Sequence, residues 1–416
     1  MVAGCHGFCC TPKRALQKLN FVLELTDGVR GFFGCGEFCL TGYSMRKILS
    51  FFGDGLGSLC SRVFCSLPGT GEVAELVRSS RASAMESISS LRDKSKNLLF
   101  TNMDLGLYHF YRGNVQDAKA RFWLISLVRP KLPDAYYNIG RCHLVLRDIH
   151  RAVKSFEKAL SLDKSHQESM YYLQKIEAPE KVAEVPENII RQHFNYTSEY
   201  FVEYWLIAQN YRGHEYVRSL VMNFLGDRIA ELDVLDLGCG TGVCGQFLKM
   251  KGVGRHITGV DISRRMLDIA RKCFVNGRQA YNELLCMNMH EFLRDNNKEY
   301  DVIILTEVLH YSGKRLGEIL EMCSKALAKG GIIVALVREG TGQGYRFVKE
   351  GDFFCHSGAY VQQQVELGLR LSYVNRCKIY GDRVDGLLFA ISHGDDAVAA
   401  QRKSGGADAA GAVGTT

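Results

Sequence analysis

The second half of the chain alternates short apolar runs with segments of helical periodicity. Five such runs lie at 233–237, 256–260, 281–286, 300–306 and 331–337. Strands separated by helices pair in parallel, because each helix carries the chain back across the sheet. Two later runs, Leu371–Tyr380 and Gly386–Ile391, leave no room for a helix between them and predict an antiparallel hairpin. The pattern therefore predicts an α/β domain whose seven-stranded sheet ends in a hairpin.

A different pattern, with a period of 34 residues, begins near residue 101. It pairs Gly106 with Gly140, His109 with His143, Asn114 with Asp148, Ala118 with Ala152, and Phe122 with Phe156. Small residues suit the close approach of two helices, and the aromatic residues fill the space between them. Both copies resemble the tetratricopeptide repeat (TPR), a helix hairpin of this period. Met170–Leu173 begins a further helix in phase, which we expect to cap two repeats.

Composition divides the chain into four parts and a short linker. Residues 1–95 have no readable pattern, and the TPR-like helical repeats occupy 96–178. A short linker, Glu177–Glu187, contains Pro179 and Pro186. The α/β domain is predicted for 188–393, where the first forty residues read as helices rich in aromatic side chains. The tail, 394–416, is rich in Ala, Gly and Ser without aromatic residues and is predicted to be disordered.

A glycine-rich loop follows the first predicted strand, in Asp236-Leu-Gly-Cys-Gly-Thr-Gly242. Its glycines allow the chain to turn sharply beneath a ligand, and the helix that follows presents free N–H groups. Asp261 ends the second strand 19 residues after Gly242. A carboxylate at that place accepts hydrogen bonds from both hydroxyls of a ribose. The spacing predicts a site for a nucleoside cofactor.

Two cofactor classes compete for this loop. Residues 240–245 also satisfy G-x-G-x-x-G, the pattern of dinucleotide-binding folds. Asp236, however, would repel a pyrophosphate, whereas it suits the cationic amino-acid end of S-adenosylmethionine. The chain also closes with a hairpin and not with a second mononucleotide-binding half. These features favour S-adenosyl-L-methionine as the cofactor.

Residues 188–393 resemble the Rossmann-like domain of class I S-adenosylmethionine-dependent methyltransferases. The resemblance rests on the glycine loop, on Asp261, on the turn Leu327-Ala-Lys-Gly-Gly331 before the fifth strand, and on the terminal hairpin. It implies contacts with the methionine part, the ribose, the adenine and the sulfonium, in that order along the chain. The cofactor-binding residues so implied are Asp236, Gly238, Cys239, Gly240, Gly242, Asp261, Ile262, Asn288, Met289 and Thr306. Asn288 stands where the family usually has Asp, and its side-chain oxygen can still accept a hydrogen bond from the adenine amino group.

Three local patterns are similar to bacterial predicted methyltransferases that contain TPR repeats. They are Phe194-Asn-Tyr-Thr197, Leu235–Gly245, and Phe354-Cys-His-Ser-Gly-Ala-Tyr-Val361. This resemblance implies one chain that joins a methyltransferase domain to helical repeats. The repeats predict either a groove for a protein or peptide partner or a purely structural adaptor.

Methyl transfer from a sulfonium needs alignment and sometimes a base. Candidate bases are His310, just after the fourth strand, and His356, in a later loop, while Glu307 is expected to face both cofactor and acceptor. The Asn-Pro-Pro-Tyr type of signature that accompanies amino-group methylation of DNA or protein is absent after the fourth strand. The acceptor, a small molecule or a protein, is left open. The alternative is a TPR adaptor that binds S-adenosylmethionine without turnover.

Composition adds a few exclusions. The net charge of +7 comes without a Lys/Arg block, so no nucleic-acid partner is expected. No signal peptide or membrane span is read from the sequence, which favours a cytoplasmic protein with reduced thiols. The clustered residues Cys5, Cys9, Cys10, Cys35 and Cys39 lack metal-site spacing, so no metal is predicted. Tyr43–Leu67 reads as a packing helix, with an interfacial helix as the alternative. The oligomeric state is not predicted.

Overall fold

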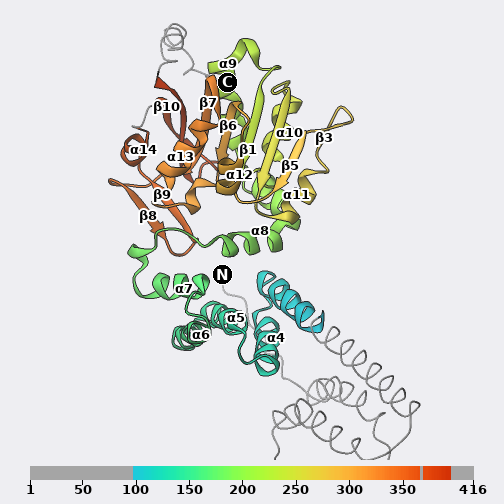
Figure 1. The fold of residues 1–416 in the computed structure, drawn as a ribbon, viewed down its shortest axis with the longest axis vertical. Helices are drawn as coiled ribbons and strands as arrows, with labels where there is room; N and C mark the ends of the chain where they lie inside the picture. Colours follow the sequence, from blue (N-terminus) through green and yellow to red (C-terminus); the bar gives the residue numbers. More distant parts are fainter. Residues whose placement is uncertain (1–96, 366–368, 395–416) are drawn as a thin grey trace, which may run out of the picture. The chain divides into compact units, whose positions relative to one another are not determined.

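The computed structural model describes residues 97–365 and 369–394 (Figure 1). All the described residues belong to one unit, Ser89–Thr416, of the two into which contacts divide the chain. The predictions for residues 1–95, including the cysteine cluster and Tyr43–Leu67, lie outside the described residues. The prediction for the tail also lies outside them, apart from Gly394.

One seven-stranded sheet organises the second half of the chain. Its order is β10-β11-β7-β6-β1-β2-β5 (Figure 1). The five parallel strands are β1 (Asp233–Leu237), β2 (His256–Asp261), β5 (Glu283–Cys286), β6 (Tyr300–Thr306) and β7 (Leu327–Arg338). The hairpin strands are β10 (Leu369–Lys378) and β11 (Asp385–His393). The predicted fold class is confirmed, and β11, the second strand of the hairpin, is the one that pairs with β7.

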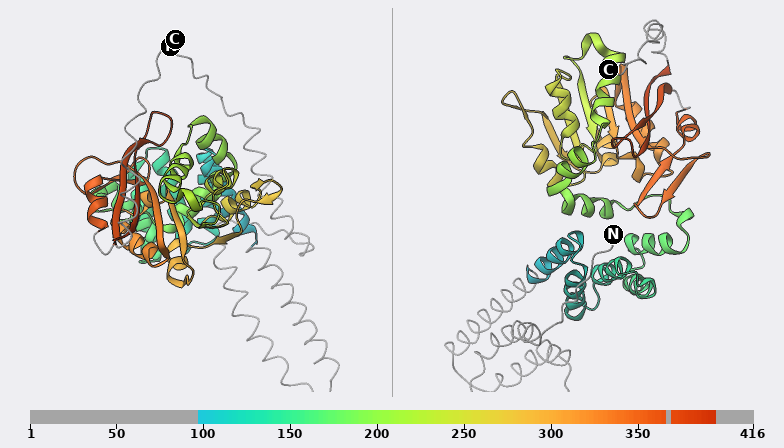
Figure 2. Two further views of the ribbon diagram at one scale, coloured as in Figure 1. Left: turned by 90° about the horizontal axis from the view of Figure 1, so that it is seen from above. Right: turned by 180° about the vertical axis from the view of Figure 1, so that it is seen from behind.

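The central strands bury side chains on both faces, as strands between two helical layers must. In β1, Leu235 and Leu237 face one core while Val234 faces the other. The first core packs α12 (Met289–Asp295), α13 (Leu316–Lys325) and α14 (Gly358–Gln364) against the sheet. The second core packs α9 (Gly213–Leu225) and α10 (Val243–Met250). Figure 2 shows these helices on the two sides of the sheet.

Some elements of this domain differ from the predictions. The segment expected as a turn before the fifth strand, Leu327–Gly331, falls within β7, where the pairing with β6 shifts register between Tyr300 and Val302. Gly330 adopts a φ of +76° in that irregular stretch. Two short hairpins were not predicted, namely β3–β4 (Phe274–Val275, Arg278–Gln279) and β8–β9 (Tyr345–Val348, Phe353–His356). Their strands are too short for a two-residue periodicity to stand out.

The first half of the described chain is helical, as predicted. A helix at 97–111 pairs with α4 (Val115–Val128), and α5 (Pro133–Val145) pairs with α6 (Ile149–Leu162). The expected cap is α7 (Gln167–Glu177). The two hairpins share one inner contact. A Cβ atom added at Gly106 would lie 2.6 Å from the Phe122 ring, and one at Gly140 would lie 2.6 Å from the Phe156 ring. The 34-residue period in the sequence therefore corresponds to one helix-to-helix contact that occurs in both hairpins.

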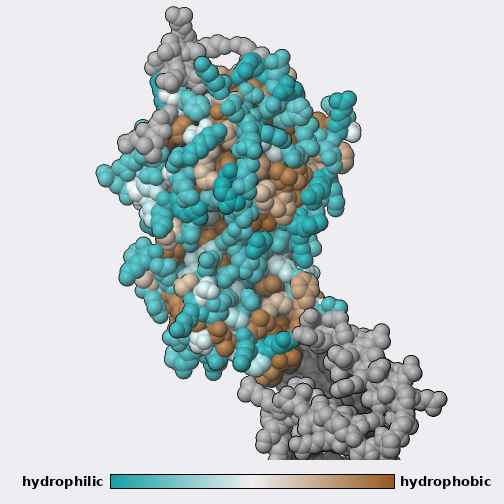
Figure 3. All heavy atoms as spheres, viewed as in Figure 1, coloured by the Kyte–Doolittle hydropathy of each residue, from teal (hydrophilic) through white to brown (hydrophobic). Residues whose placement is uncertain are grey.

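The repeats leave apolar side chains on their surface, coloured brown over α4 in Figure 3. Large exposed residues of α4 are Trp123, Leu124, Leu127 and Val128. Solenoid repeats bury such faces against neighbouring units. No helix of the described residues is long and apolar enough to cross a membrane.

A packed connection joins the repeats to the sheet domain. After α7 come η2 (Pro179–Lys181) and a stretch in which Val182 and Val185 are buried. Its backbone is fixed by the N–H of Val185, which donates to the carbonyl of Tyr311 at 3.1 Å. The aromatic segment then forms α8 (Glu187–Phe201), a π-helical turn η3 (Val202–Ala208) and α9. The predicted linker is thus part of the folded unit.

Candidate functional site

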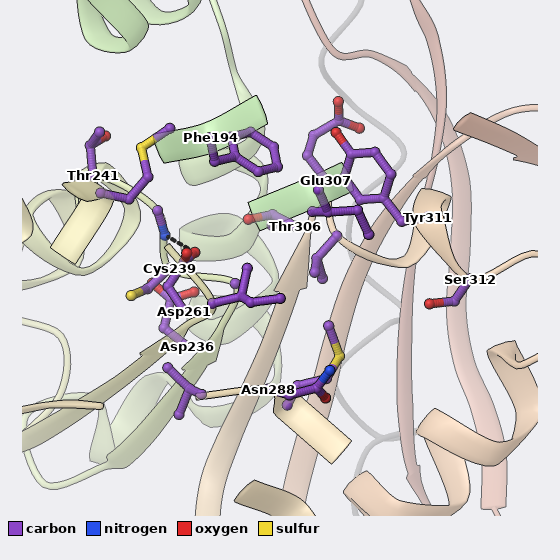
Figure 4. A pocket seen from close by; sticks show the side chains of 18 of the residues that line it. Phe194, Asp236, Cys239, Thr241, Asp261, Asn288, Thr306, Glu307, Tyr311 and Ser312 are labelled. Carbon is purple, nitrogen blue, oxygen red and sulfur yellow. Dashed lines mark hydrogen bonds between the residues drawn. The ribbon is translucent and has the colours of Figure 1, made fainter. Parts of the chain in front are cut away.

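A cavity of about 450 Å³ lies at the carboxyl ends of the parallel strands. Strand order reverses there, because β2 and β5 lie on one side of β1 and β6 lies on the other. Open α/β sheets bind ligands at such a switch point. The volume is within the range of small-molecule sites. The predicted cofactor-binding residues that line the cavity are Asp236, Gly238, Cys239, Gly240, Asp261, Ile262, Asn288, Met289 and Thr306 (Figure 4).

The glycine loop turns between β1 and α10. Gly238 adopts a φ of +73°, and a Cβ atom on it would approach the Val308 side chain to 2.8 Å. Gly242, at a φ of +81°, is the residue before α10 and does not line the cavity. A Cβ on Gly242 would lie 3.0 Å from both Ala270 and Tyr281. Gly242 therefore shapes the loop. Because Gly242 is not among the lining residues, its contact with the cofactor stays a prediction.

Tyr281, which precedes β5, supports the loop from behind. Its hydroxyl donates to Asp236 Oδ2 at 2.7 Å and accepts from the N–H of Gly245 at 3.0 Å. Burial raises the pKa of Asp236 to about 7, partly offset by the hydrogen bond from Tyr281. Tyr281 was not among the predicted site residues. No local pattern could have found it, because its partners lie 36 and 45 residues away along the chain.

Asp261 links the second strand to the loop. Its carboxylate, labelled in Figure 4, accepts from the N–H of Gly240 at 2.9 Å. It also accepts from the N–H of Ser263 at 2.7 Å. Burial raises the pKa of Asp261 to about 6, against the opposing effect of these two backbone donors. The side chain is 9% exposed and borders the cavity. A buried carboxylate held by backbone donors is a rigid acceptor for ligand hydroxyls.

Asn288, after β5, is already engaged by the protein. Its side-chain oxygen accepts from the N–H of His290 at 2.7 Å and so caps α12, while its amide donates to Glu187 Oε2 at 2.6 Å. The predicted hydrogen bond from adenine to Asn288 stays a prediction. Glu187, from α8, also lines this end of the cavity and was not foreseen.

The opposite end of the cavity is formed by the carboxyl end of β6. Glu307 lies there with a φ of +55°, a strained conformation for a residue other than glycine. Its Oε2 accepts from Tyr380 at 2.8 Å and from Arg338 at 3.2 Å, whereas the buried Oε1 has no hydrogen-bond partner. Figure 4 shows Thr306, Glu307 and Tyr311 on this side of the site.

The two predicted histidine bases do not line the cavity. His310 is 3% exposed, its Nδ1 lies 3.9 Å from Glu307 Oε1, and burial lowers its pKa well below the usual value. His356 is fully buried, packs against Tyr360, and has a pKa lowered by burial to about 4. Their catalytic role stays a prediction. Tyr311, the neighbour of His310, is the residue of that segment that reaches the cavity.

Aromatic side chains form a large part of the cavity lining. Phe194 and Phe201 come from α8, Trp205 from η3, and Tyr211 and Tyr380 from the segments beside them. The rings contact one another, with Trp205 and Tyr380 centred 5.1 Å apart. The sequence marked several of these residues as an aromatic helical segment without assigning them to the site. They face the cavity because α8 and η3 pack across the strand ends.

The described part of the chain contains neither a metal-binding group of side chains nor a disulfide bond. Within residues 97–365 and 369–394, no group of three or more His, Cys, Asp or Glu side chains could hold a metal ion. The eight cysteines in these ranges are free thiols. Cys239 and Cys244 lie in and beside the glycine loop, where burial raises the pKa of each thiol. Both are therefore neutral packing residues around neutral pH.

Comparisons with known proteins agree with this geometry. Residues 234–331 match the methyltransferase domain family, and residues 133–166 match the tetratricopeptide repeat family. A malonyl-[acyl-carrier protein] O-methyltransferase of Priestia megaterium is 25% identical over 159 residues, which are 38% of this chain and 55% of that protein. A ubiquinone biosynthesis O-methyltransferase of Aromatoleum aromaticum is 29% identical over 119 residues, 27% of this chain and 48% of that protein. The chain thus spans about half the length of these curated relatives.

A solved structure is also similar. Magnesium protoporphyrin IX methyltransferase from Synechocystis PCC 6803, with bound S-adenosylmethionine, has a TM-score of 0.38 and 18% identity. The match covers 51% of this chain and all of that one. Most of the parallel sheet and the glycine loop lie where the methyltransferase domain family matches, at 234–331, and the hairpin of α5 and α6 lies where the tetratricopeptide repeat family matches, at 133–166.

Proposed function

We propose that this chain transfers a methyl group from S-adenosylmethionine to a small-molecule or protein acceptor bound beside Glu307. The observation that carries the proposal is one continuous cavity. It runs from the glycine loop and Asp261 at one end to Thr306 and Glu307 at the other. A donor and an acceptor can therefore meet inside it, as an in-line displacement requires.

The charges of the cavity fit a cationic cofactor. Asp236 and Asp261 are both buried, and burial raises the pKa of each. Neither carboxylate forms an ion pair within the described residues, whereas a buried negative charge is costly unless a cation compensates it. The bound cofactor would supply an ammonium, a sulfonium and the transferable methyl group. Asp236 would attract the ammonium, and Asp261 would accept the ribose hydroxyls.

Glu307 is the residue that we propose at the acceptor. Glu307 lines the cavity, and Arg338 and Tyr380 hold its Oε2 in place, whereas the buried Oε1 lies 3.9 Å from His310 Nδ1 without a hydrogen-bond partner. A small turn of the side chain would bring Oε1 to an acceptor O–H or N–H. Such a contact would turn the acceptor lone pair toward the methyl group and could receive the acceptor proton. The surrounding aromatic rings would exclude water from this end.

The test compares cofactor binding with methyl transfer. Calorimetry with S-adenosylmethionine measures the first, and transfer of a labelled methyl group into fractionated cell lysate measures the second. We expect Glu307→Gln to bind the cofactor normally and to lower transfer by about 10²- to 10⁴-fold, the usual effect of losing an acid–base group. Asp236→Ala should lose binding and transfer together.

Glu321→Gln is the matched control. Glu321 is an exposed carboxylate on α13 that pairs with Lys325, so its removal should change neither measurement. A wild-type protein that binds the cofactor but transfers no label would indicate an adaptor without turnover. A wild-type protein that binds neither S-adenosylmethionine nor S-adenosylhomocysteine would refute the cofactor assignment itself.

A further inference from the structure

Helix α8 presents two different faces. Ile190, Phe194 and Phe201 line the cofactor cavity. A second stripe, Asn188, Gln192, Tyr196 and Glu199, makes its side-chain contacts with the helical repeats. Residues spaced by three and four positions share one face of a helix. Helix α8 therefore lines the cofactor cavity with one face and contacts the repeats with the other.

Each helix that opens a hairpin or the cap contributes to this contact. From α7, Glu168 accepts from the amide of Asn188 at 2.6 Å. From α5, Arg141 donates to Gln192 Oε1 at 3.1 Å.

The helix at 97–111 completes the surface. The Tyr111 and Tyr196 rings are stacked with their centroids 5.3 Å apart, and the Tyr196 hydroxyl donates to Asp104. Arg112 forms an ion pair with Glu199. The surface of the repeats made by Asp104, Tyr111, Arg112, Arg141 and Glu168 is called the α8-binding surface below.

Arg141 is the buried centre of the α8-binding surface. It is 3% exposed and lies over the Phe110 ring, with its Cζ 4.3 Å from the ring centroid. Its guanidinium donates to the Tyr111 hydroxyl at 2.8 Å and to Asn138 and Gln192 at 3.1 Å each. All these acceptors are neutral, and no carboxylate in the described residues forms an ion pair with it. Because a buried cation depends on every hydrogen bond it has, loss of Gln192 would be unfavourable.

The same helix contacts the cofactor side directly. Asn195 Oδ1 accepts from the hydroxyl of Ser263 at 2.8 Å. Ser263 caps α11 (Arg264–Ala270), and its backbone N–H is one of the two donors to Asp261. A displacement of α8 would thus disturb the segment that fixes Asp261.

We propose that the repeats clamp α8 over the cavity, so that the α8-binding surface controls exchange of the cofactor. The inference rests on the proposed function, since it concerns the same cavity. It also identifies the segment that fills the α8-binding surface, which is the chain's own helix α8. A protein that binds the α8-binding surface must displace α8 and would open the cofactor site.

The exposed ion pair allows a charge-swap test. Glu199→Arg places two cations together, and Arg112→Glu places two carboxylates together, whereas the double variant restores an opposite pair. The cofactor dissociation rate would be followed by the fluorescence of Trp205, which lines the cavity, in a Trp123→Phe background. We expect each single variant to release S-adenosylhomocysteine about two- to fivefold faster, the range that a surface ion pair can supply. The double variant should return close to the starting rate.

Arg151→Glu is the control for charge reversal on the repeats. Arg151 is exposed and pairs with Asp148 of the same hairpin, away from α8. Gln192→Ala gives a second, uncharged probe, and it should also speed release. Equal melting temperatures across the set exclude unfolding as the cause. Unchanged release in both single variants and in Gln192→Ala would overturn the clamp while leaving the proposed function intact, whereas a wild type without cofactor binding would overturn both.

Discussion

Asp236 and Asp261 are placed alike, at the ends of neighbouring strands, yet the chain holds them differently. Asp236 has a single side-chain donor, Tyr281, while Asp261 receives two backbone N–H groups. Backbone donors favour the ionised form, which is consistent with the lower of the two raised pKa values belonging to Asp261. At the residue scale, the site is therefore a pair of carboxylates that a cationic ligand would stabilise.

Asp261→Asn should weaken S-adenosylmethionine binding by about 10- to 150-fold. The substitution keeps the shape but removes the charge from hydrogen bonds to the ribose, which are worth about 1.5–3 kcal/mol. Calorimetry on the two proteins checks this. Asp268→Asn, on the exposed side of α11 where Asp268 pairs with Arg271, is the control and should bind normally. Similar affinities for Asp261→Asn and wild type would contradict the ribose contact.

Cofactor affinity should depend on pH between about 5 and 7.5. The pKa values of Asp261 and Asp236 are raised to about 6 and about 7, so both carboxylates lose charge as the pH falls through this window. Because the ionised forms attract the cationic ligand, binding should weaken by about tenfold per unit between pH 7 and pH 6, where one proton is taken up, and more steeply below pH 6, where the second proton is taken up. Titration calorimetry over this range tests it. A dissociation constant that does not change with pH would show that neither carboxylate titrates in the free protein.

The glycines of the loop and Asp261 could be found from the sequence because their spacing along the chain is local. Tyr281 and the aromatic cover could not, since their contacts join distant segments. The histidines illustrate the same limit. A position next to the strand end placed His310 near the site, but the short helix η5 (Leu309–Tyr311) turns His310 inward, so that Tyr311 is the residue that lines the cavity.

The repeated helix hairpin is held by an aromatic ring against a glycine. Phe122 and Phe156 are both fully buried, and Phe156 also stacks on Tyr172 of the cap with centroids 5.2 Å apart. The interior of each hairpin depends on one large ring. Loss of that ring should therefore destabilise either repeat in the same way. At the scale of elements, this contact is what the 34-residue period in the sequence encodes.

Phe156→Ala should destabilise the repeats by about 3–5 kcal/mol, because it leaves a cavity between α5, α6 and α7. Urea denaturation followed by circular dichroism measures the change. Phe100→Ala is the matched control, since Phe100 is 76% exposed and its loss should cost less than about 0.5 kcal/mol. Equal effects of the two substitutions would contradict the packing role of Phe156.

The long parallel strands were predictable because buried strands read as continuous apolar runs. The small hairpins β3–β4 and β8–β9 were not, since each is set by pairing of a few residues and not by periodicity. Strand β7 was predicted at 331–337, whereas it begins at Leu327. The residues of β7 before Ile332 pair irregularly with β6. Their place in the strand follows from pairing with β6 and could not be read from the sequence pattern.

The repeats and the methyltransferase domain share contacts across the whole described unit. One hydrophobic cluster contains Tyr137 and Phe156 from the repeats, Val185 from the connection and Phe354 from β9. Asp352, beside β9, accepts from Tyr171 and pairs with Lys175 of α7. At the scale of the molecule, cofactor binding and the repeats are therefore expected to respond to each other.

Saturating S-adenosylmethionine should stabilise more than the cavity. At a hundred times the dissociation constant it should add about 2.7 kcal/mol to the stability of the bound form. We expect slower amide hydrogen exchange in α8 and in α5 around Arg141, because α8 links the two. Hydrogen-exchange mass spectrometry with and without the cofactor measures this. Protection that ends at the glycine loop and leaves α8 and α5 unchanged would indicate that the repeats do not sense the cofactor.

The fold class, the repeat and the cofactor loop could be predicted from the sequence, because each depends on periodicity or on the spacing of neighbouring residues. What surrounds that loop depends on the tertiary structure. It brought Tyr281 behind Asp236, lined the cavity with aromatic rings, and left both candidate histidines out of its lining. It also placed α8 between the repeats and the cavity. These features arise from contacts between segments far apart in the chain, which local patterns of polarity do not record.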